Sequence, residues 1–341
     1  MNQKFEFQGE CSYDRCESCL LFSLCETCYN EICLFENCDR FCGRCPIRCH
    51  RNPDVEFEQE ADMHDLRLHK PIPPLNARCA WFPTIRKNPA LRGIPLEVAA
   101  IKFEEIYNER SGLIREYDLH AYLEIPLKTK IIVTFNIKDK ILENLWLTFR
   151  RGLLKLLLKP LKADYICSPN FSCYFDTPRY AWWRNIWRNV MIAREFQELG
   201  FKVILDVSSP VQATHNYYID LIEKNRIKCL MFNCQTLKLN RHKRFAYERF
   251  RVFDRLPMDV EFIITGLTSL KEAEPIYKLL RRKIYFTSSS PFLKAICQQT
   301  LRSHRRVTES AENLARKYFA YFNNLHLGLR NAYKHTGKKA R

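Results

Sequence analysis

The chain has 341 residues, of which 46% are hydrophobic and 27% charged, with a formal net charge of +17. This composition favours a folded globular protein and excludes a largely disordered one. No run of about 18 uncharged apolar residues can span a bilayer, and no early stretch has the residue order of a secretion signal. We therefore expect a soluble, cytoplasmic protein without a transmembrane segment.

The N-terminal region is dense in cysteine. Ten of the 16 cysteines lie within a stretch of about forty residues, namely Cys11, Cys16, Cys19, Cys25, Cys28, Cys33, Cys38, Cys42, Cys45 and Cys49. Secreted disulfide scaffolds are similarly dense, but they carry a secretion signal. In a reducing compartment a thiolate cluster is stable chiefly as a metal site. The spacing predicts a metal-binding module over residues 1–52, with these cysteines as ligands.

Two metals fit this module. The Cys-x-x-Cys pairs Cys16/Cys19, Cys25/Cys28 and Cys42/Cys45 place two sulfurs of a tight turn toward one ion, as structural zinc sites require. Cys11-x4-Cys16-x2-Cys19 also matches the first ligands of a plant-type iron–sulfur cluster. Cys38-x3-Cys42-x2-Cys45 resembles the triplet of radical S-adenosylmethionine enzymes, although Arg44 replaces their usual aromatic residue. Zinc is the metal we expect, and an iron–sulfur cluster is the alternative.

Charge divides the chain into an acidic head and a basic body. Residues 1–60 hold 12 acidic and 6 basic side chains, a net charge of −6, so the remaining 281 residues carry +23. Such an asymmetry is typical of a body that meets a polyanion, most often a nucleic acid. The acidic head is a structural module or a docking site for a protein partner.

The body is predicted to be α/β. Residues 53–125 are predicted to hold two parts. The first is a proline-containing connector that lies over the surface, and the second is a helical lead-in from Val98 to about Arg110. Residues 126–303 alternate apolar strands with amphipathic helices, and residues 304–341 hold a last helix and a basic tail. We expect strands at 131–135, 164–167, 202–207, 227–232, 260–265 and 283–287. The expected helices lie near 140–159, 179–199, 212–225, 240–255, 268–281, 291–302 and 308–332.

Six strands joined by crossover helices predict a parallel sheet, either a partial barrel or a doubly wound sheet. In both folds the ligand site lies at the carboxyl ends of the strands. Polar residues follow the predicted strands there, and the candidate pocket residues are Ser168, Asn170, Ser172, Tyr174, Asp206, Asn233, Gln235 and Thr287. Asp206 is the carboxylate most clearly placed at a strand end, where it serves either a reaction or a salt bridge to Arg179.

Basic residues cluster in two segments on the same predicted face. The helix from position 179 carries three tryptophans and three arginines, and Trp183, Trp187 and Val190 are spaced to form its buried stripe. Arginine pairs with phosphates and stacks on bases. The candidate nucleic-acid contacts are Arg179, Arg184 and Arg188 on this helix, and Arg241, Lys243 and Arg244 in the later basic run.

One resemblance accompanies these patterns. The stretch Ser168-Pro169-Asn170-Phe171-Ser172-Cys173-Tyr174, the following Thr177-Pro178-Arg179 and Arg184-Asn185, and the later Asn233-Cys234-Gln235-Thr236 and Gly266-Leu267 are distinctive. Over about residues 125–300 the chain resembles a bacterial and phage or plasmid family known only as a domain of unknown function. The resemblance implies a shared fold and a setting on mobile genetic elements, but no activity. The family more often has Asp in place of Asn170, which argues against a metal-binding or acidic role there.

Three functions remain open from the sequence. The first is a metal-binding, basic nucleic-acid-binding protein whose body grips phosphates. The second is an iron–sulfur or metal-dependent enzyme with its site at the carboxyl ends of the parallel strands. The third is a protein-interaction module. The sequence contains no triad, paired-carboxylate or phosphate-loop signature that decides among them.

Overall fold

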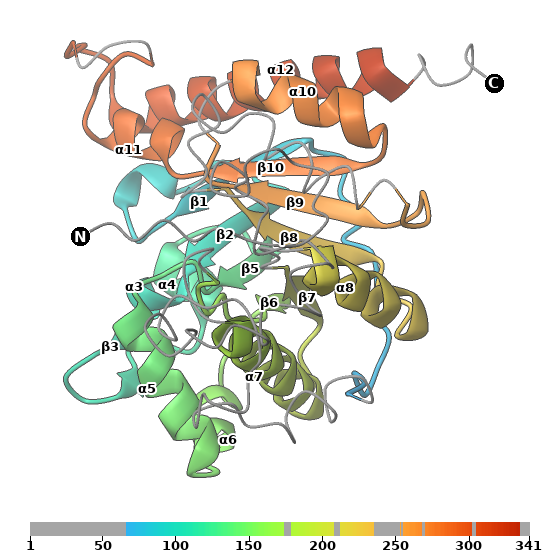
Figure 1. Ribbon diagram of the computed structural model, residues 1–341. Helices are drawn as coiled ribbons and strands as arrows, with labels where there is room; N and C mark the ends of the chain where they lie inside the picture. Colours follow the sequence, from blue (N-terminus) through green and yellow to red (C-terminus); the bar gives the residue numbers. More distant parts are fainter. Residues whose placement is uncertain are drawn as a thin grey trace, which may run out of the picture.

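The body of the protein is a closed barrel of eight parallel strands (Figure 1). The computed structural model describes residues 66–173, 179–207, 212–234, 253, 255–267, 270–301 and 305–334. The strands pair in the order β1-β10-β9-β8-β7-β6-β5-β2, with β2 returning to β1. Their bounds are β1 Trp81–Ile85, β2 Val98–Lys102, β5 Lys130–Thr134, β6 Tyr165–Cys167, β7 Val203–Asp206, β8 Cys229–Asn233, β9 Glu261–Thr265 and β10 Ile284–Ser288.

The predicted parallel α/β sheet is confirmed, but it has two more strands than predicted and it closes. The missed strands are β1, which lies in the predicted connector, and β2, which lies in the predicted helical lead-in. The apolar run that forms β2 is buried along its length, and such a run cannot be told from a buried helix by periodicity alone. Because β1 and β2 belong to the barrel, a domain boundary at residue 126 would divide it.

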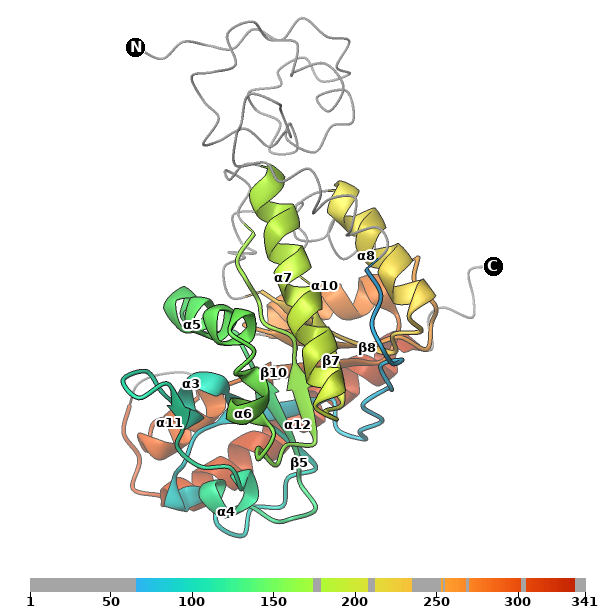
Figure 2. The same ribbon diagram turned by 90° about the horizontal axis from the view of Figure 1, so that it is seen from below.

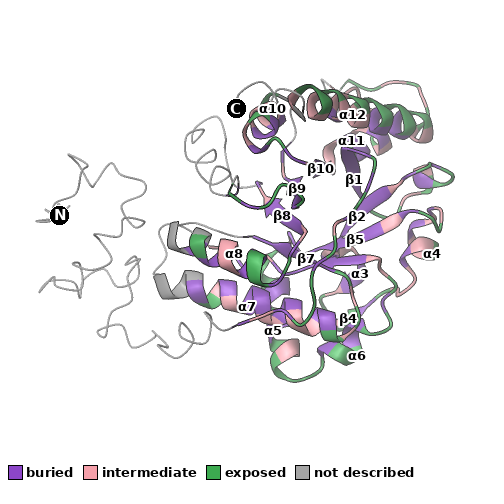
Figure 3. Cartoon of the chain, turned by 90° about the vertical axis from the view of Figure 1, so that its right-hand side faces the viewer, coloured by how far each residue is buried: buried purple, intermediate pink, exposed green. Residues whose placement is uncertain are grey.

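Helices surround the barrel and connect its strands (Figure 3). They are α3 Phe103–Ile106, α4 Leu119–Leu123, α5 Asp139–Arg150, α6 Leu154–Leu158, α7 Arg179–Glu198, α8 Gln212–Lys224, α10 Leu270–Leu280, α11 Ser290–Ile296 and α12 Ala311–Lys334. A small hairpin, β3 Tyr107–Asn108 and β4 Leu113–Ile114, follows α3. The helix predicted over 140–159 is divided into α5 and α6 at Gly152, whose φ of 67° lies in the left-handed region.

The connection between β1 and β2 differs from the other crossovers. It holds only the short 3-10 helix η6, Pro89–Leu91, and α12 packs against β1 and η6 on this side of the barrel. Trp81 of β1 contacts the rings of Phe319 and Phe322 on α12, with centroid distances of 5.7 and 5.4 Å.

On another side of the barrel, α7 and α8 lie side by side (Figure 2). No helix in the described part of the chain is long and apolar enough to cross a membrane.

The amino ends of the strands, which we call the base of the barrel, are closed by residues 66–80. This segment was predicted to lie over the surface, but Ile72 and Leu75 are buried. Its backbone is held by side chains of the barrel, because Glu261 accepts hydrogen bonds from the backbone N–H groups of Leu75 (2.7 Å) and Asn76 (3.1 Å). The hydroxyl of Tyr285 lies 3.0 Å from the backbone nitrogen of Ala77. Buried backbone polar groups need such partners, which is why an irregular segment can close this end.

Candidate functional site at the barrel mouth

Asp206 occupies the opposite end of the barrel, the carboxyl ends of the strands, which we call the mouth. It is the last residue of β7 and is 1% exposed. Burial raises the pKa of its carboxyl group well above the usual value, and a hydrogen bond from Asn170 opposes this shift. Among the described residues, no donor lies within hydrogen-bonding distance of its Oδ1 atom. A buried carboxyl group with an uncommitted oxygen is a feature of functional sites, because a purely structural carboxyl is normally satisfied.

Two asparagines connect Asp206 to the interior of the barrel. Nδ2 of Asn170 donates to Oδ1 of Asn136 at 3.4 Å, in addition to its contact with Asp206. Nδ2 of Asn136 lies 3.6 Å from the sulfur of Met231, and the Cys167 thiol lies at the same distance from that sulfur. Burial raises the pKa of Cys167 well above its usual value, so this thiol is neutral. Asp206 is therefore followed toward the barrel interior by two neutral amides and then by the sulfur atoms of Met231 and Cys167.

Other strands also end in polar residues at the mouth. Thr84 of β1 and Thr287 of β10 share a hydrogen bond of 2.9 Å between their hydroxyl groups, and both are buried. Thr265 ends β9, and Lys102 ends β2 and pairs with Glu104 at 3.5 Å. Thr84 and Lys102 were missed as candidates because their strands were missed. A signal was present, since Thr84 directly follows the apolar residues 81–83 and Lys102 directly follows the apolar residues 98–101.

The predicted pocket residues fall into three groups. Asn170, Asp206 and Thr287 lie at the mouth as expected, and half-buried Asn233 ends β8 there. Ser168 is fully buried, and its Oγ accepts the backbone N–H of Asp206 at 2.8 Å, so this hydroxyl holds β6 against β7. Ser172 points instead to Asp139, with 3.3 Å between Oγ and Oδ1. Tyr174 and Gln235 lie outside the described residues.

The predicted nucleic-acid contacts on α7 behave differently from one another. Arg184 is exposed, as predicted. Arg188 is 5% exposed, its guanidinium donates to Glu143 at 2.6 Å, and it lies 3.7 Å from the ring centroid of Phe171. Arg188 was therefore wrongly assigned to the surface, because its helical position packs against α5 and the loop after β6. The stripe of Trp183, half-buried Trp187 and Val190 is confirmed. The side chains of Arg179, Arg241, Lys243 and Arg244 lie outside the described part.

The cysteine predictions divide in the same way. All ten predicted metal ligands precede residue 66, so they lie outside the described residues. Within the described ranges, no group of three or more His, Cys, Asp or Glu side chains is arranged to hold a metal ion. Of the six remaining cysteines, Cys79, Cys167, Cys229 and Cys234 are buried, whereas Cys173 is half-buried and Cys297 is exposed. Most of these cysteines therefore act as small core residues, as predicted.

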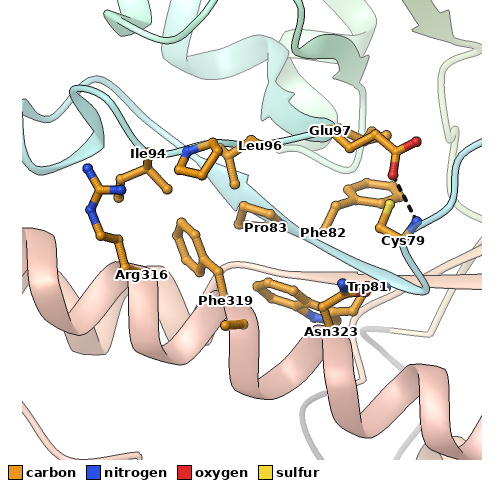
Figure 4. A pocket seen from close by; sticks show the side chains of 13 residues that line it. Cys79, Trp81, Phe82, Pro83, Ile94, Leu96, Glu97, Arg316, Phe319 and Asn323 are labelled. Carbon is orange, nitrogen blue, oxygen red and sulfur yellow. Dashed lines mark hydrogen bonds between the residues drawn. The ribbon is translucent and has the colours of Figure 1, made fainter.

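A hollow lies on the flank of the barrel, between α12 and the β1–β2 connection (Figure 4). Its volume is about 400 Å³, and Arg316 and Glu97 lie at its two ends with apolar side chains between them. The polar groups are already committed to the fold. Glu97 accepts the backbone N–H groups of Arg78 and Cys79, each at 2.9 Å, and Arg316 pairs with Glu312 at 2.9 Å. The mouth is therefore the stronger candidate, because Asp206 keeps an uncommitted polar atom.

Comparison with known proteins adds a match to a family model over part of the chain, but no activity. The model of a family described as a domain of unknown function (DUF4417) matches residues 95–256. This agrees with the resemblance to an uncharacterised domain family and does not extend to a phage or plasmid origin. None of the curated proteins matches the chain.

Two solved structures are similar in outline. The YdjI aldolase of Escherichia coli K12 is 10% identical, with a TM-score of 0.44, over 80% of this chain and 94% of the aldolase chain. A designed, cube-shaped, highly porous protein cage is 12% identical, with a TM-score of 0.39, over 77% of both chains. Both TM-scores are low, and neither likeness supports an inference about function.

Proposed function

We propose that the barrel mouth is a ligand site at which Asp206 exchanges a proton with the bound molecule. The observation that carries this proposal is the buried Asp206 carboxyl group, whose Oδ1 has no donor within reach among the described residues. Parallel barrels present their reactive groups at this end of the strands. The asparagines beside Asp206, Asn170 and Asn136, supply hydrogen bonds and no charge, which leaves Asp206 as the acid or base among these three residues.

The raised pKa of Asp206 supports a role as an acid. Burial favours the protonated form of its carboxyl group, and this form can donate a proton or a hydrogen bond to a ligand oxygen or nitrogen. Asn170 contacts both Asp206 and Asn136, and an amide carries acceptor and donor groups at once. The site is thus suited to a ligand with both donor and acceptor atoms, and Asp206 acts as its general acid.

We propose a nucleic acid as the ligand class. The formal net charge of the whole chain is +17, and exposed cations follow two strands at the mouth, Arg86 and Lys87 after β1 and Lys138 after β5. Arg184 is exposed within the first turns of α7, which follows β6 and so begins at the mouth. Phosphate contacts by such cations supply sequence-independent affinity. Nucleobases also carry the donor and acceptor atoms that the neutral mouth residues require.

The binding part of the proposal is tested by titrating the full chain with a fluorescently labelled single-stranded oligonucleotide at several ionic strengths. We expect an affinity that falls steeply with salt, and a slope that decreases by about 1 in Arg184→Ala, as for a lost phosphate contact. Lys202→Ala is the matched control, because Lys202 is also exposed but lies before β7, at the base. Absence of binding at low salt, or equal effects of both substitutions, would overturn this part.

The reaction part requires a separate measurement. Labelled DNA and RNA oligonucleotides are incubated with the wild-type chain and with Asp206→Asn, and the products are resolved by length and mass. We expect a wild-type product that is lost in Asp206→Asn while the affinity for the oligonucleotide stays within about twofold, because the substitution removes the proton and keeps the shape. Oligonucleotides that are bound and released unchanged by the wild type would refute the acid role.

The cysteine-rich head is proposed to bind a metal through its ten thiolates, with zinc first and an iron–sulfur cluster as the alternative. This proposal rests on the spacing of Cys-x-x-Cys pairs and on the density of cysteine in residues 1–52. Metal analysis and an absorbance spectrum of protein prepared without oxygen distinguish the two metals. A colourless, zinc-loaded protein would remove the cluster, and a metal-free protein with reduced thiols would refute both.

A further inference from the structure

The loop after β6 carries Asn170 to the mouth, and α7 holds the two residues that follow Asn170. Phe171 is 2% exposed, and its backbone N–H donates to Oδ1 of Asn189 at 3.2 Å. One turn earlier on the helix, Nδ2 of Asn185 donates to the backbone carbonyl of Ser172 at 2.7 Å. The two asparagines therefore bind the two residues that directly follow Asn170, and they fix the course of the backbone there.

Arg188 lies between these asparagines and completes the contact. Its guanidinium donates to Oδ1 of Asn185 at 3.3 Å and to Oε2 of Glu143 at 2.6 Å. The same group lies 3.7 Å from the ring centroid of Phe171 and 5.0 Å from that of Trp146 on α5. A planar guanidinium can stack on rings and donate in its own plane at once, which an ammonium group cannot. Arg188 thus ties α5, α7 and the loop together.

We infer that Arg188 is a positioning residue for the mouth, because it holds the loop of residues 168–173 so that the Asn170 amide stays against Asp206. This inference rests on the proposed role of the mouth and deepens it. Arg188 itself reaches no ligand. It acts through Phe171 and Asn185, and this role gives a reason for an arginine with a buried charge on α7.

The cost of this arrangement supports a role beyond packing. A buried guanidinium loses its hydration, and burial lowers the pKa of Arg188 while its bond to Glu143 opposes the shift. Apolar residues of similar volume pack as well at such positions without that loss. What an apolar residue cannot do is bond Asn185 and stack on Phe171 at the same time.

The test follows the Asp206 carboxyl carbon by ¹³C NMR across a pH titration of the full chain, with Asp206→Asn to assign the resonance. Asn170→Ala removes the hydrogen bond that opposes the raised pKa of Asp206, so its titration midpoint moves to higher pH. We expect Arg188→Lys to move the midpoint in the same direction, and the double variant to move it no further than Asn170→Ala alone. Arg194→Lys, on the same helix but bonded to His69, is the control.

A second measurement applies if the Asp206 carboxyl group stays protonated over the whole accessible pH range, where no titration midpoint can be observed. Exchange of the Asn170 side-chain amide protons with solvent is measured at one pH, and it should accelerate about tenfold in Arg188→Lys. Asn185→Ala, which removes one side-chain bond to the loop, should act in the same direction if Arg188→Lys fails to fold.

The two possible failures are distinguishable. An Asp206 resonance that moves in Asn170→Ala but not in Arg188→Lys or Asn185→Ala, with unchanged amide exchange, would refute the positioning role alone. An Asp206 titration midpoint that is insensitive to Asn170→Ala, together with wild-type Asn170 amide protons that exchange as fast as those of an exposed asparagine, would refute the contact on which the proposed mouth site depends.

Discussion

The two ends of the barrel each hold a buried carboxyl group, and the structure treats the two groups in opposite ways. At the base, Glu261 accepts two backbone N–H groups through Oε2 and the Lys283 ammonium at 2.7 Å through Oε1. At the mouth, Asp206 is equally buried, yet no donor among the described residues reaches its Oδ1. A charged group with complete partners stabilises a fold, whereas a carboxyl group without them is retained at a cost in stability.

This difference supports the proposal that structural and functional residues are separated along the barrel axis. The base is closed by an irregular segment that needs the Glu261 carboxylate, so the residue serves stability. The mouth gathers hydroxyl and amide groups near the Asp206 carboxyl group, whose Oδ1 has no partner among the described residues. Barrels commonly divide their residues in this way, with stability at the amino ends of the strands and chemistry at the carboxyl ends.

The largest expected effect concerns the base. Glu261→Ala leaves the Lys283 charge and two buried backbone N–H groups without their partner, and it should lower the free energy of unfolding by about 3–5 kcal/mol. Chemical denaturation measures the change, with Glu223→Ala on the exposed face of α8 as a control that should stay within about 0.5 kcal/mol. A loss no larger than that of the control would remove the distinction between the two ends.

The second prediction uses a buried base on the flank of the barrel. His326 of α12 is buried beside Tyr277, with 3.3 Å between Nδ1 and the hydroxyl, and burial lowers its pKa from 6.5 to about 4. Between these two pKa values the unfolded chain binds more protons than the folded chain. The free energy of unfolding is therefore highest above pH 6.5, and it falls by about 3 kcal/mol as the pH approaches 4. His326→Phe should flatten this part of the pH profile; an unchanged slope would assign it to other groups.

Asp206 should make the stability of the protein depend on pH in the opposite direction. Its pKa is raised in the folded protein, so the folded state binds the proton more tightly and stability falls as the pH rises above the ordinary value of an aspartic acid. Asp206→Asn keeps the shape without the titration and should stabilise the protein at pH 7 by about 1–3 kcal/mol. Thermal and chemical unfolding at pH 5 and pH 8 test it. A variant less stable than the wild type would place Asp206 with Glu261 among the structural residues.

The smallest expected effect on stability is that of replacing Arg184, an exposed cation of the mouth. Arg184→Ala should change the free energy of unfolding by no more than about 0.5 kcal/mol, because exposed side chains contribute little. Its effect on oligonucleotide binding should nevertheless exceed that of Lys202→Ala at the base. Denaturation curves and salt titrations of the same two variants separate folding from binding, and a large loss of stability in Arg184→Ala would contradict the assignment.

The sequence by itself determined the parallel α/β class, most of the helices and the central strands, because apolar strand runs and amphipathic helices alternate with clear periods. It also located Asp206, Asn170 and Thr287 at strand ends, since parallel strands bring their carboxyl ends to one edge. The buried stripe of α7 followed from residue spacing as well. These are local patterns, and each can be read within one element and its immediate neighbours.

Three features were decided by the tertiary structure alone. They are the closure of the barrel, the segment that covers its base and the burial of Arg188. β1 and β2 are short buried runs whose identity as strands depends on partners far away in sequence, β10 and β5. The segment at 66–80 is irregular, so only its bonds to Glu261 and Tyr285 distinguish a buried closure from a surface connector. Arg188 lies one turn after exposed Arg184 on α7, so its position in the helix does not predict its burial. Its burial depends on contacts with α5 and the loop after β6. Long-range contacts decide these features, because the local sequence patterns fit more than one structure.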